Sequence, residues 1–188
     1  MTIRKLTHPE IAGRRFTAEE LSKMDRFPVF ALLDDIRSLY NVGSIFRTAD
    51  GARLSQLILS GFTPRPPRKE IEKTALGATG TVPWTYAKDP LEAIGELRRQ
   101  GVRICLVEQT DRSVPVDALA AADLPLCLVI GNEIRGIRKE IVEAADIAVE
   151  IPMYGMKQSL NAAVAFGIAA FACARLAAAR EKSQGTRE

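Results

Sequence analysis

The stretch Ile151-Pro152-Met153-Tyr154-Gly155-Met156-Lys157-Gln158-Ser159-Leu160-Asn161 decides the fold of this 188-residue chain. It follows an apolar run of strand length, residues 146–151, and precedes a long alanine-rich segment. The pattern predicts a strand, a polar turn and then a helix that opens at Ser159. Such turns hold ligands in α/β proteins, because the first amide groups of a helix are unpaired and its dipole is positive there. Taken alone, Ser159 is better explained as an ordinary N-cap, for which serine is favoured.

Further apolar runs of strand length alternate with helical segments along the rest of the chain. The predicted strands cover residues 28–33, 57–59, 82–87, 102–107, 124–130 and 146–151. Helices are predicted at 44–49, 91–100 and 137–145, and from Ser159 onward. Most strands are continuous apolar runs, which is typical of a parallel sheet covered on both faces. The predicted fold class is therefore α/β, a mostly parallel sheet with helices on both faces.

Composition narrows the class of function. A hydrophobic content of 47% suffices for one full core, and a net charge of +3 permits a nucleic-acid partner without requiring one. The three cysteines, Cys105, Cys127 and Cys173, have no metal-ligand spacing, and His8 is the only histidine. We therefore expect reduced thiols and no metal site, and we do not expect a histidine-based catalytic triad.

One segment, residues 160–179, has the length of a membrane span. It is rich in alanine and carries Asn161 and Arg175, so a helix buried against the sheet or against a partner subunit is the favoured interpretation. No apolar N-terminal segment resembling a signal peptide is present. We expect a cytoplasmic protein without a membrane partner.

Three predicted strand-to-helix turns carry unusual polar side chains. The pairs are Asn41 with Arg47, Asn132 with Glu133, and Ser159 with Asn161. Turns that follow parallel strands lie at one edge of the sheet, where α/β proteins bind ligands. We therefore expect these three turns to meet.

Two basic segments are candidates for contact with RNA phosphates. The proline-rich segment GFTPRPPRKEIEK (residues 61–73) contains Arg65, Arg68 and Lys69, and the first 27 residues are also basic. A solvated loop and a loosely packed helix, opened by a capping box at Thr17, explain these segments about as well.

The three turns together resemble a known family. NVGSIFRTADG (residues 41–51), LVIGNEIRGI (128–137) and IPMYGMKQSLNAAVA (151–165) are similar to motifs 1, 2 and 3 of the SpoU family, also called TrmH, of RNA ribose methyltransferases. The resemblance covers residues 30–174. It implies a SPOUT fold with a C-terminal trefoil knot, which general topology rules would not predict. The implied domains are a basic N-terminal extension (1–27), a SPOUT methyltransferase domain (28–180) and a disordered tail (181–188).

The resemblance also implies ligands and partners. The family binds S-adenosylmethionine among three loops, forms homodimers with the active site at the interface, and acts on RNA such as tRNA or rRNA. The residues implied to contact the cofactor are Val107, Glu108, Gly131, Asn132, Ile151, Met153, Ser159 and Leu160. The residues implied to act in catalysis are Arg47, Asn41, Glu133, Ser159 and Asn161.

The chain departs from the family's pattern in two ways, and the roles of Arg47 and Glu133 need interpretation. Motif 2 continues as Gly136-Ile137-Arg138, where the family usually has leucine and a small polar residue, and no accessory RNA-binding domain is recognised. We interpret Arg47 as an electrostatic stabiliser, since arginine keeps its proton up to a pKa above ~12. Glu133 is either a proton acceptor or, as we favour, an orienting residue. Alternative functions are a SPOUT-fold RNA-binding protein, a base methyltransferase and a flavodoxin-like flavin-binding protein.

Overall fold

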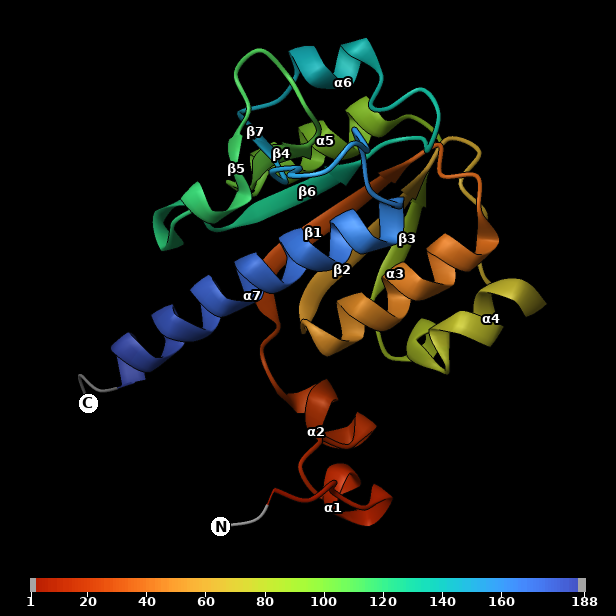
Figure 1. Cartoon of the computed structure of the whole chain (residues 1–188), viewed down its shortest axis with the longest axis vertical. Coiled ribbons are helices and arrows are strands. Elements are labelled where there is room, and N and C mark those ends of the chain that lie inside the picture. The colour runs from red at the N-terminus through yellow and green to blue at the C-terminus, as the bar shows by residue number, and fades with distance from the viewer. Residues whose placement is uncertain (1–2, 186–188) are drawn as a thin grey trace.

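A computed structural model describes residues 3–185 and contains one seven-stranded sheet (Figure 1). Its strand order is β3-β2-β1-β6-β4-β7-β5, and every strand pair is parallel. The strands are β1 (Phe27–Asp34), β2 (Leu54–Ser60), β3 (Trp84–Ala87), β4 (Arg103–Val107), β5 (Val114–Pro115), β6 (Leu126–Ile130) and β7 (Ile147–Glu150). This confirms the predicted parallel α/β fold. Strand order alone does not decide how the chain is threaded, so the trefoil knot stays a prediction.

Helices cover both faces of the sheet, as predicted. They are α1 (His8–Ala12), α2 (Ala18–Lys23), α3 (Leu39–Gly51), α4 (Lys69–Ala75), α5 (Pro90–Arg99), α6 (Lys139–Glu143) and α7 (Ala162–Gly185), with short 3₁₀ turns at Ala78–Gly80, Val116–Ala118 and Ala121–Asp123. Helices α3, α4 and α7 lie on one face, and α5 and α6 lie on the other (Figure 1).

Strand β1, which lies inside the sheet between β2 and β6, shows why both faces need helices. Val29, Ala31 and Leu33 are fully buried in the cluster beneath α3, α4 and α7. Leu32 points to the other face and is fully buried in the cluster beneath α5 and α6. Each buried side chain of this size contributes about 1.5–3 kcal/mol.

Helix α3 begins earlier than predicted. Asn41 and Gly43 were expected in a turn, but they lie in the first turns of α3, whose N-cap Ser38 accepts a hydrogen bond from the Asn41 amide at 3.2 Å. A Cβ atom at Gly43 would lie 2.2 Å from the carbonyl oxygen of Ile71 and 2.1 Å from Thr74 Oγ1. The glycine therefore serves the close packing of α3 on α4, which a local sequence pattern does not reveal.

Helix α7 begins later than predicted. It starts at Ala162 instead of Ser159, because Asn161 is the capping residue and its Oδ1 accepts the Ala163 amide at 2.9 Å. The helix continues to Gly185, so residues 181–185 of the predicted disordered tail are helical. Residues 186–188 lie outside the described part of the chain.

By length and composition, α7 is apolar enough to cross a membrane over Ala162–Ser183. In the fold, its side chains Phe166, Ala169, Ala170 and Cys173 are fully buried against the sheet. The helix therefore occupies the place expected of a core helix.

The basic N-terminal extension forms α1 and α2, which stand off from the sheet (Figure 1). The predicted capping box is present, since Thr17 Oγ1 accepts the Glu20 amide and the Glu20 carboxylate accepts the Thr17 amide. Arg26 fastens the end of the extension by donating to the carbonyl groups of Leu54 and Thr81.

Candidate active site

Hydrogen bonds join the three polar turns at the carboxyl edge of the sheet. Asn161 Nδ2 donates to Asn41 Oδ1 at 3.1 Å, and Asn41 Nδ2 donates to Glu133 Oε1 at 2.9 Å. These side chains come from the start of α7, from α3 and from the loop after β6. The prediction that the three turns meet is confirmed.

Glu133 is the anchor of this network. Its carboxylate also accepts the backbone amides of Arg37 at 2.9 Å and Ser38 at 3.1 Å, at the positive end of α3. Partial burial acts to raise the pKa of Glu133, but the hydrogen bonds from Arg37, Asn41 and Ser38 outweigh it and leave the pKa below its ordinary value. At neutral pH the group is a carboxylate with three donors on its two oxygens, which is an arrangement that orients its neighbours.

Asn132 organises the loop that carries Glu133. Its Nδ2 donates to the Asp35 carbonyl oxygen at 2.7 Å, and its Oδ1 accepts the amides of Ile134 and Arg135, both at 3.0 Å. A Cβ at the preceding Gly131 would lie 2.5 Å from the Gly136 carbonyl carbon. The side chain of Asn132 is therefore committed to the loop, which is fixed in one shape.

Arg138 ties the same region to the sheet. Arg138 falls within the helix predicted at 137–145, but it lies before α6 and its Nε donates to Asp34 Oδ2 at 2.9 Å. A second contact joins the guanidinium to Asp34 Oδ1. Asp34 is fully buried at the end of β1, so the ion pair compensates a carboxylate that would otherwise be unpaired.

A cavity of about 340 Å³ opens beside the network, between the carboxyl ends of β4, β6 and β7. Every residue predicted to contact a cofactor lines it: Val107, Glu108, Gly131, Asn132, Ile151, Met153, Ser159 and Leu160. Glu133 and Asn161 line it as well. The cavity lies within the range of about 300–1,000 Å³ that is usual for small-molecule sites.

The lining combines an apolar interior with polar groups at the rim. Val107, Ile130, Ile151 and Leu160 supply apolar surface, which suits a flat heterocyclic group. The carboxylate of Glu108 is held on the loop, accepting the amides of Gln109 at 3.0 Å and Ile137 at 3.3 Å. Among residues 3–185, no group of three or more His, Cys, Asp or Glu side chains is arranged for a metal ion.

Sequence reasoning missed several lining residues, including Gln109, Glu150 and Ala165. Gln109 Nε2 donates to the Gln158 carbonyl oxygen at 2.6 Å and so closes the loop after β4 onto the 151–161 segment. Glu150 accepts a hydrogen bond from Ser113 Oγ at 2.6 Å. Their position in the sequence could have identified Gln109 and Glu150, since both lie at the carboxyl ends of strands, where parallel sheets bind ligands.

Ser159 is an exposed residue of the cavity wall and does not cap α7. Its hydroxyl makes no hydrogen bond to any residue of the described chain, whereas Asn161 does the capping. The hydroxyl is therefore free for a ligand, which favours the predicted role over that of an N-cap.

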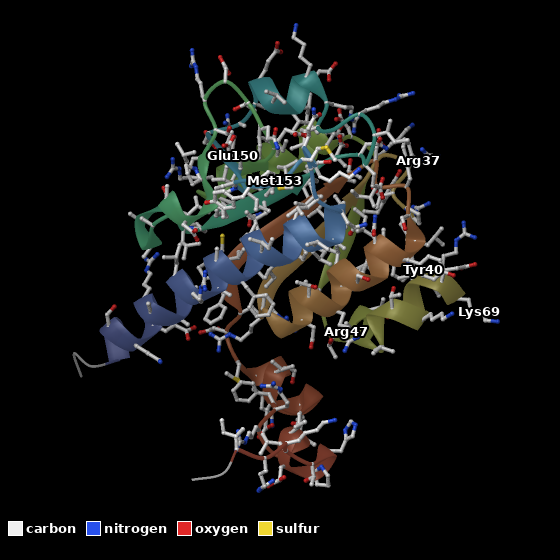
Figure 2. The ribbon with its side chains drawn as sticks, in the orientation of Figure 1. Arg37, Tyr40, Arg47, Lys69, Glu150 and Met153 are labelled. Carbon is white, nitrogen blue, oxygen red and sulfur yellow. The ribbon has the colours of Figure 1, made fainter. Side chains whose placement is uncertain are left out.

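Two predicted catalytic residues, Asn41 and Arg47, do not line the cavity. Asn41 is hydrogen-bonded to Glu133 and Asn161, which do line it, whereas Arg47 lies further along α3. It is exposed on α3, six residues after Asn41, which corresponds to about 9 Å along a helix. Figure 2 shows Arg47 well separated from Met153 of the cavity wall. Arg65 and Arg68 are also exposed and line a second hollow that reaches β3, and the exposed Lys69 follows them as the first residue of α4.

Comparison with known proteins agrees with this geometry. The model of the SpoU rRNA Methylase family matches residues 28–171. The tRNA (guanosine(18)-2'-O)-methyltransferase of Aquifex aeolicus is 34% identical over 144 residues, which are 74% of this chain and 64% of the relative. The crystal structure of the A. aeolicus TrmH/SpoU tRNA modifying enzyme superposes with a TM-score of 0.78 at 26% identity, covering 92% of this chain and 86% of that one.

A second structure shows a ligand. The AdoMet-bound rRNA methyltransferase from Sinorhizobium meliloti has a TM-score of 0.73 at 30% identity, covering 82% of this chain and 59% of that one. The chain spans about half to two thirds of the length of several curated relatives.

The fold and the site define an α/β protein with a small-molecule cavity at the carboxyl edge of a parallel sheet. Motifs 2 and 3 line the cavity, and motif 1 is hydrogen-bonded to both through Asn41. Within that class, this chain belongs to the SpoU rRNA methylase family.

Proposed function

We propose that this protein is an S-adenosylmethionine-dependent RNA methyltransferase that acts on a ribose 2′-hydroxyl. The observation that carries the proposal is the joining of Asn41, Glu133 and Asn161 at the mouth of the cavity. The relatives named above are a tRNA 2′-O-methyltransferase and an rRNA methyltransferase with bound AdoMet, and both support it.

The cavity residues fit the cofactor. Apolar side chains from the ends of β4, β6 and β7 offer surface to a heterocycle, and the free hydroxyl of Ser159 and nearby loop groups offer polar contacts. When bound, the cofactor supplies a methyl group already activated by a positively charged sulfur. The chain then has to hold the acceptor oxygen in line with that methyl group and exclude water from the mouth.

We assign orienting roles to Glu133 and Asn41. The depressed pKa of Glu133 makes it a weak proton acceptor, and its donors hold the first turn of α3 against the loop after β6. The hydrogen bond between Asn161 and Asn41 extends this network to the residue before α7 and so holds the start of that helix in place. The mouth of the cavity is thereby pre-organised before RNA arrives.

We propose a homodimer in which Arg47 of one protomer reaches the cavity of the other. Val164, Ile168 and Phe171 are spaced along one side of α7 and remain 51%, 40% and 49% exposed. This apolar stripe runs beside α3, since a Cβ at Gly51 would lie 3.7 Å from Phe171 Cζ. A second copy that covers the stripe across a two-fold axis would remove it from water and would also meet the helix that carries Arg47.

Arg47 then acts as an electrostatic group. A guanidinium in a site closed by the dimer binds the phosphate next to the target and stabilises negative charge that develops on the 2′-oxygen. It does not remove the proton, because the arginine side chain is not deprotonated in proteins and so cannot act as a base.

The RNA partner is tRNA or rRNA, as in the relatives, and Arg65, Arg68, Lys69 and the basic segment 3–27 are proposed to contact its phosphates. We place the protein in the cytoplasm with its RNA. The trefoil knot and the division into extension, catalytic domain and tail belong to the same proposal.

Two measurements on one preparation test this function. Calorimetric titration measures the binding of S-adenosylmethionine to the cavity, and transfer of labelled methyl groups to RNA measures the reaction. Saturable binding together with transfer supports the proposal. Binding without transfer to any RNA would leave an RNA-binding protein of this fold, and label on a base would identify a base methyltransferase.

A further inference from the structure

A second hollow lies two strands away from the cofactor cavity. It has a volume of about 590 Å³ and is lined by the 61–68 loop and by Trp84 and Tyr86 of β3. Strand β2, from which the loop emerges, is separated from β6 by β1 alone, and two strand spacings amount to about 10 Å. Because all strands are parallel, the loop leaves the same edge of the sheet as the catalytic motifs.

Aromatic and cationic side chains coincide in this hollow. The guanidinium carbon of Arg65 lies 4.1 Å above the centre of the Tyr86 ring, so the two groups are stacked. Phe62 is 58% exposed and lines the same hollow. The lining carries two arginines, Arg65 and Arg68, and no acidic residue.

The positively charged side chains in and next to the hollow are not paired with carboxylates of the described chain. Arg65, Arg68 and Lys69 form no ion pair with any residue in the described part of the chain. Figure 2 shows Lys69 at the outer end of α4, where its ammonium group faces solvent. A surface with free cations and exposed rings complements a polyanion that also carries flat apolar groups.

The loop that carries Phe62 is fixed to the catalytic edge. The Phe62 amide donates to Asp35 Oδ1 at 2.9 Å, and Tyr86 Oη donates to the Gly61 carbonyl oxygen at 2.9 Å. Asp35 in turn accepts Asn132 Nδ2 on its backbone carbonyl oxygen. Any group held in the hollow is therefore kept at a constant distance from the motif 2 loop.

From these contacts we propose that Phe62 and the stacked Arg65–Tyr86 pair form a platform for an unpaired nucleobase of the substrate RNA, adjoining the nucleotide to be methylated. Bases of unpaired RNA stack on aromatic rings and on guanidinium planes, whereas bases inside a helix do not expose their faces. The inference rests on the proposed function and adds that the RNA is single-stranded next to its target. Phosphate contact alone would use the charges of Arg65 and Arg68 but not the exposed ring of Phe62.

Fluorescence of 2-aminopurine tests the platform, since stacking quenches this base. Short unpaired oligoribonucleotides that carry the base at successive positions are titrated against the full-length protein. We expect saturable quenching at one position. Phe62→Ala and Arg65→Lys should weaken this binding at least about fivefold, the lower end of what one stacked base contributes.

Three controls separate stacking from charge. Phe62→Trp keeps a ring and should retain the quenching. Arg112→Lys makes the same exchange at an exposed arginine that lines neither the hollow nor the cofactor cavity, and should bind as the wild type does. Thermal unfolding should be unchanged in all variants, because Phe62, Arg65 and Arg112 are exposed.

Quenching that survives both Phe62→Ala and Arg65→Lys would overturn the platform, and so would an equal loss in Arg112→Lys. Methyl transfer distinguishes this failure from failure of the proposed function. If Phe62→Ala still transfers methyl groups with an unchanged KM for RNA, the platform is disproved and the methyltransferase function stands. If a base stacks in the hollow but no RNA is methylated, the platform stands and the methyltransferase function is disproved.

Discussion

At the scale of single residues, Glu133 explains most of the geometry of the site. One carboxylate accepts two backbone amides at the start of α3 and the side chain of Asn41, and so joins two segments that are about 90 residues apart in the sequence. A neutral amide at this position would turn a donor toward groups that are themselves donors.

Glu133→Gln should therefore lower the free energy of unfolding by about 1–2 kcal/mol at neutral pH. Because folding lowers the pKa of Glu133 below 4.5, its contribution is fully present above pH 4.5 and is lost as the pH falls through the folded value. The difference between wild type and variant, measured by urea unfolding, should shrink on acidification below that pH.

The pH profile of methyl transfer separates an orienting role from a proton-accepting one. If Glu133 only orients its neighbours, the Gln variant keeps residual transfer with the same pH profile as the wild type. A profile whose acidic limb disappears in the variant would show that Glu133 accepts the proton.

Substitutions at Ser159 and at Arg47 should impair different steps, cofactor binding in the first case and methyl transfer in the second. Ser159→Val, which removes the free hydroxyl, should weaken S-adenosylmethionine binding about tenfold while the fold persists. Arg47→Ala should abolish transfer with a nearly unchanged dissociation constant for the cofactor. Calorimetry and label transfer on both variants check this, with Arg112→Ala, another exposed arginine, as the control. Full transfer by Arg47→Ala would contradict its assignment.

At the scale of elements, the contact between α3 and α4 places Asn41. Gly43→Ala should destabilise the fold by about 1–3 kcal/mol, because the new methyl group would collide with the Ile71 carbonyl oxygen. Gly80→Ala is the matched control, since a Cβ there meets no atom within 4 Å. Thermal unfolding of both variants measures the difference. Equal stability would mean that α3 and α4 can separate without cost.

The elements also show what the sequence can and cannot predict. Strand positions and the parallel sheet follow from continuous apolar runs, and the shared edge of the polar turns follows from parallel topology. Helix starts were less accurate, since the beginning of α3 depends on Ser38 and on packing against α4, and that of α7 on Asn161. Arg138 was misplaced because its partner Asp34 lies 104 residues away.

At the scale of the whole molecule, the position of Arg47 requires a second copy of the chain in our account. Val164→Glu together with Phe171→Glu should convert a dimer into monomers, because two charges would be buried at the covered stripe. Light scattering gives the mass. The monomer should bind S-adenosylmethionine but transfer no methyl group, and a variant that stays dimeric would contradict the proposed interface.

Sharing of the site between protomers has its own signature. Arg47→Ala leaves the cavity intact, whereas a Ser159 variant leaves the arginine intact. When the two inactive variants are mixed and allowed to exchange subunits, heterodimers should regain one complete site and part of the wild-type activity. No recovery would mean that each protomer uses its own Arg47.

The most direct test of the central claim is nucleoside mass spectrometry after methyl transfer. Purified protein is incubated with methyl-labelled S-adenosylmethionine and with tRNA and rRNA, kept separate, from a strain that lacks its gene. The account predicts label in a single 2′-O-methylated nucleoside of one RNA class. Label on a base, or no label in either class from a protein that binds no cofactor, would contradict it.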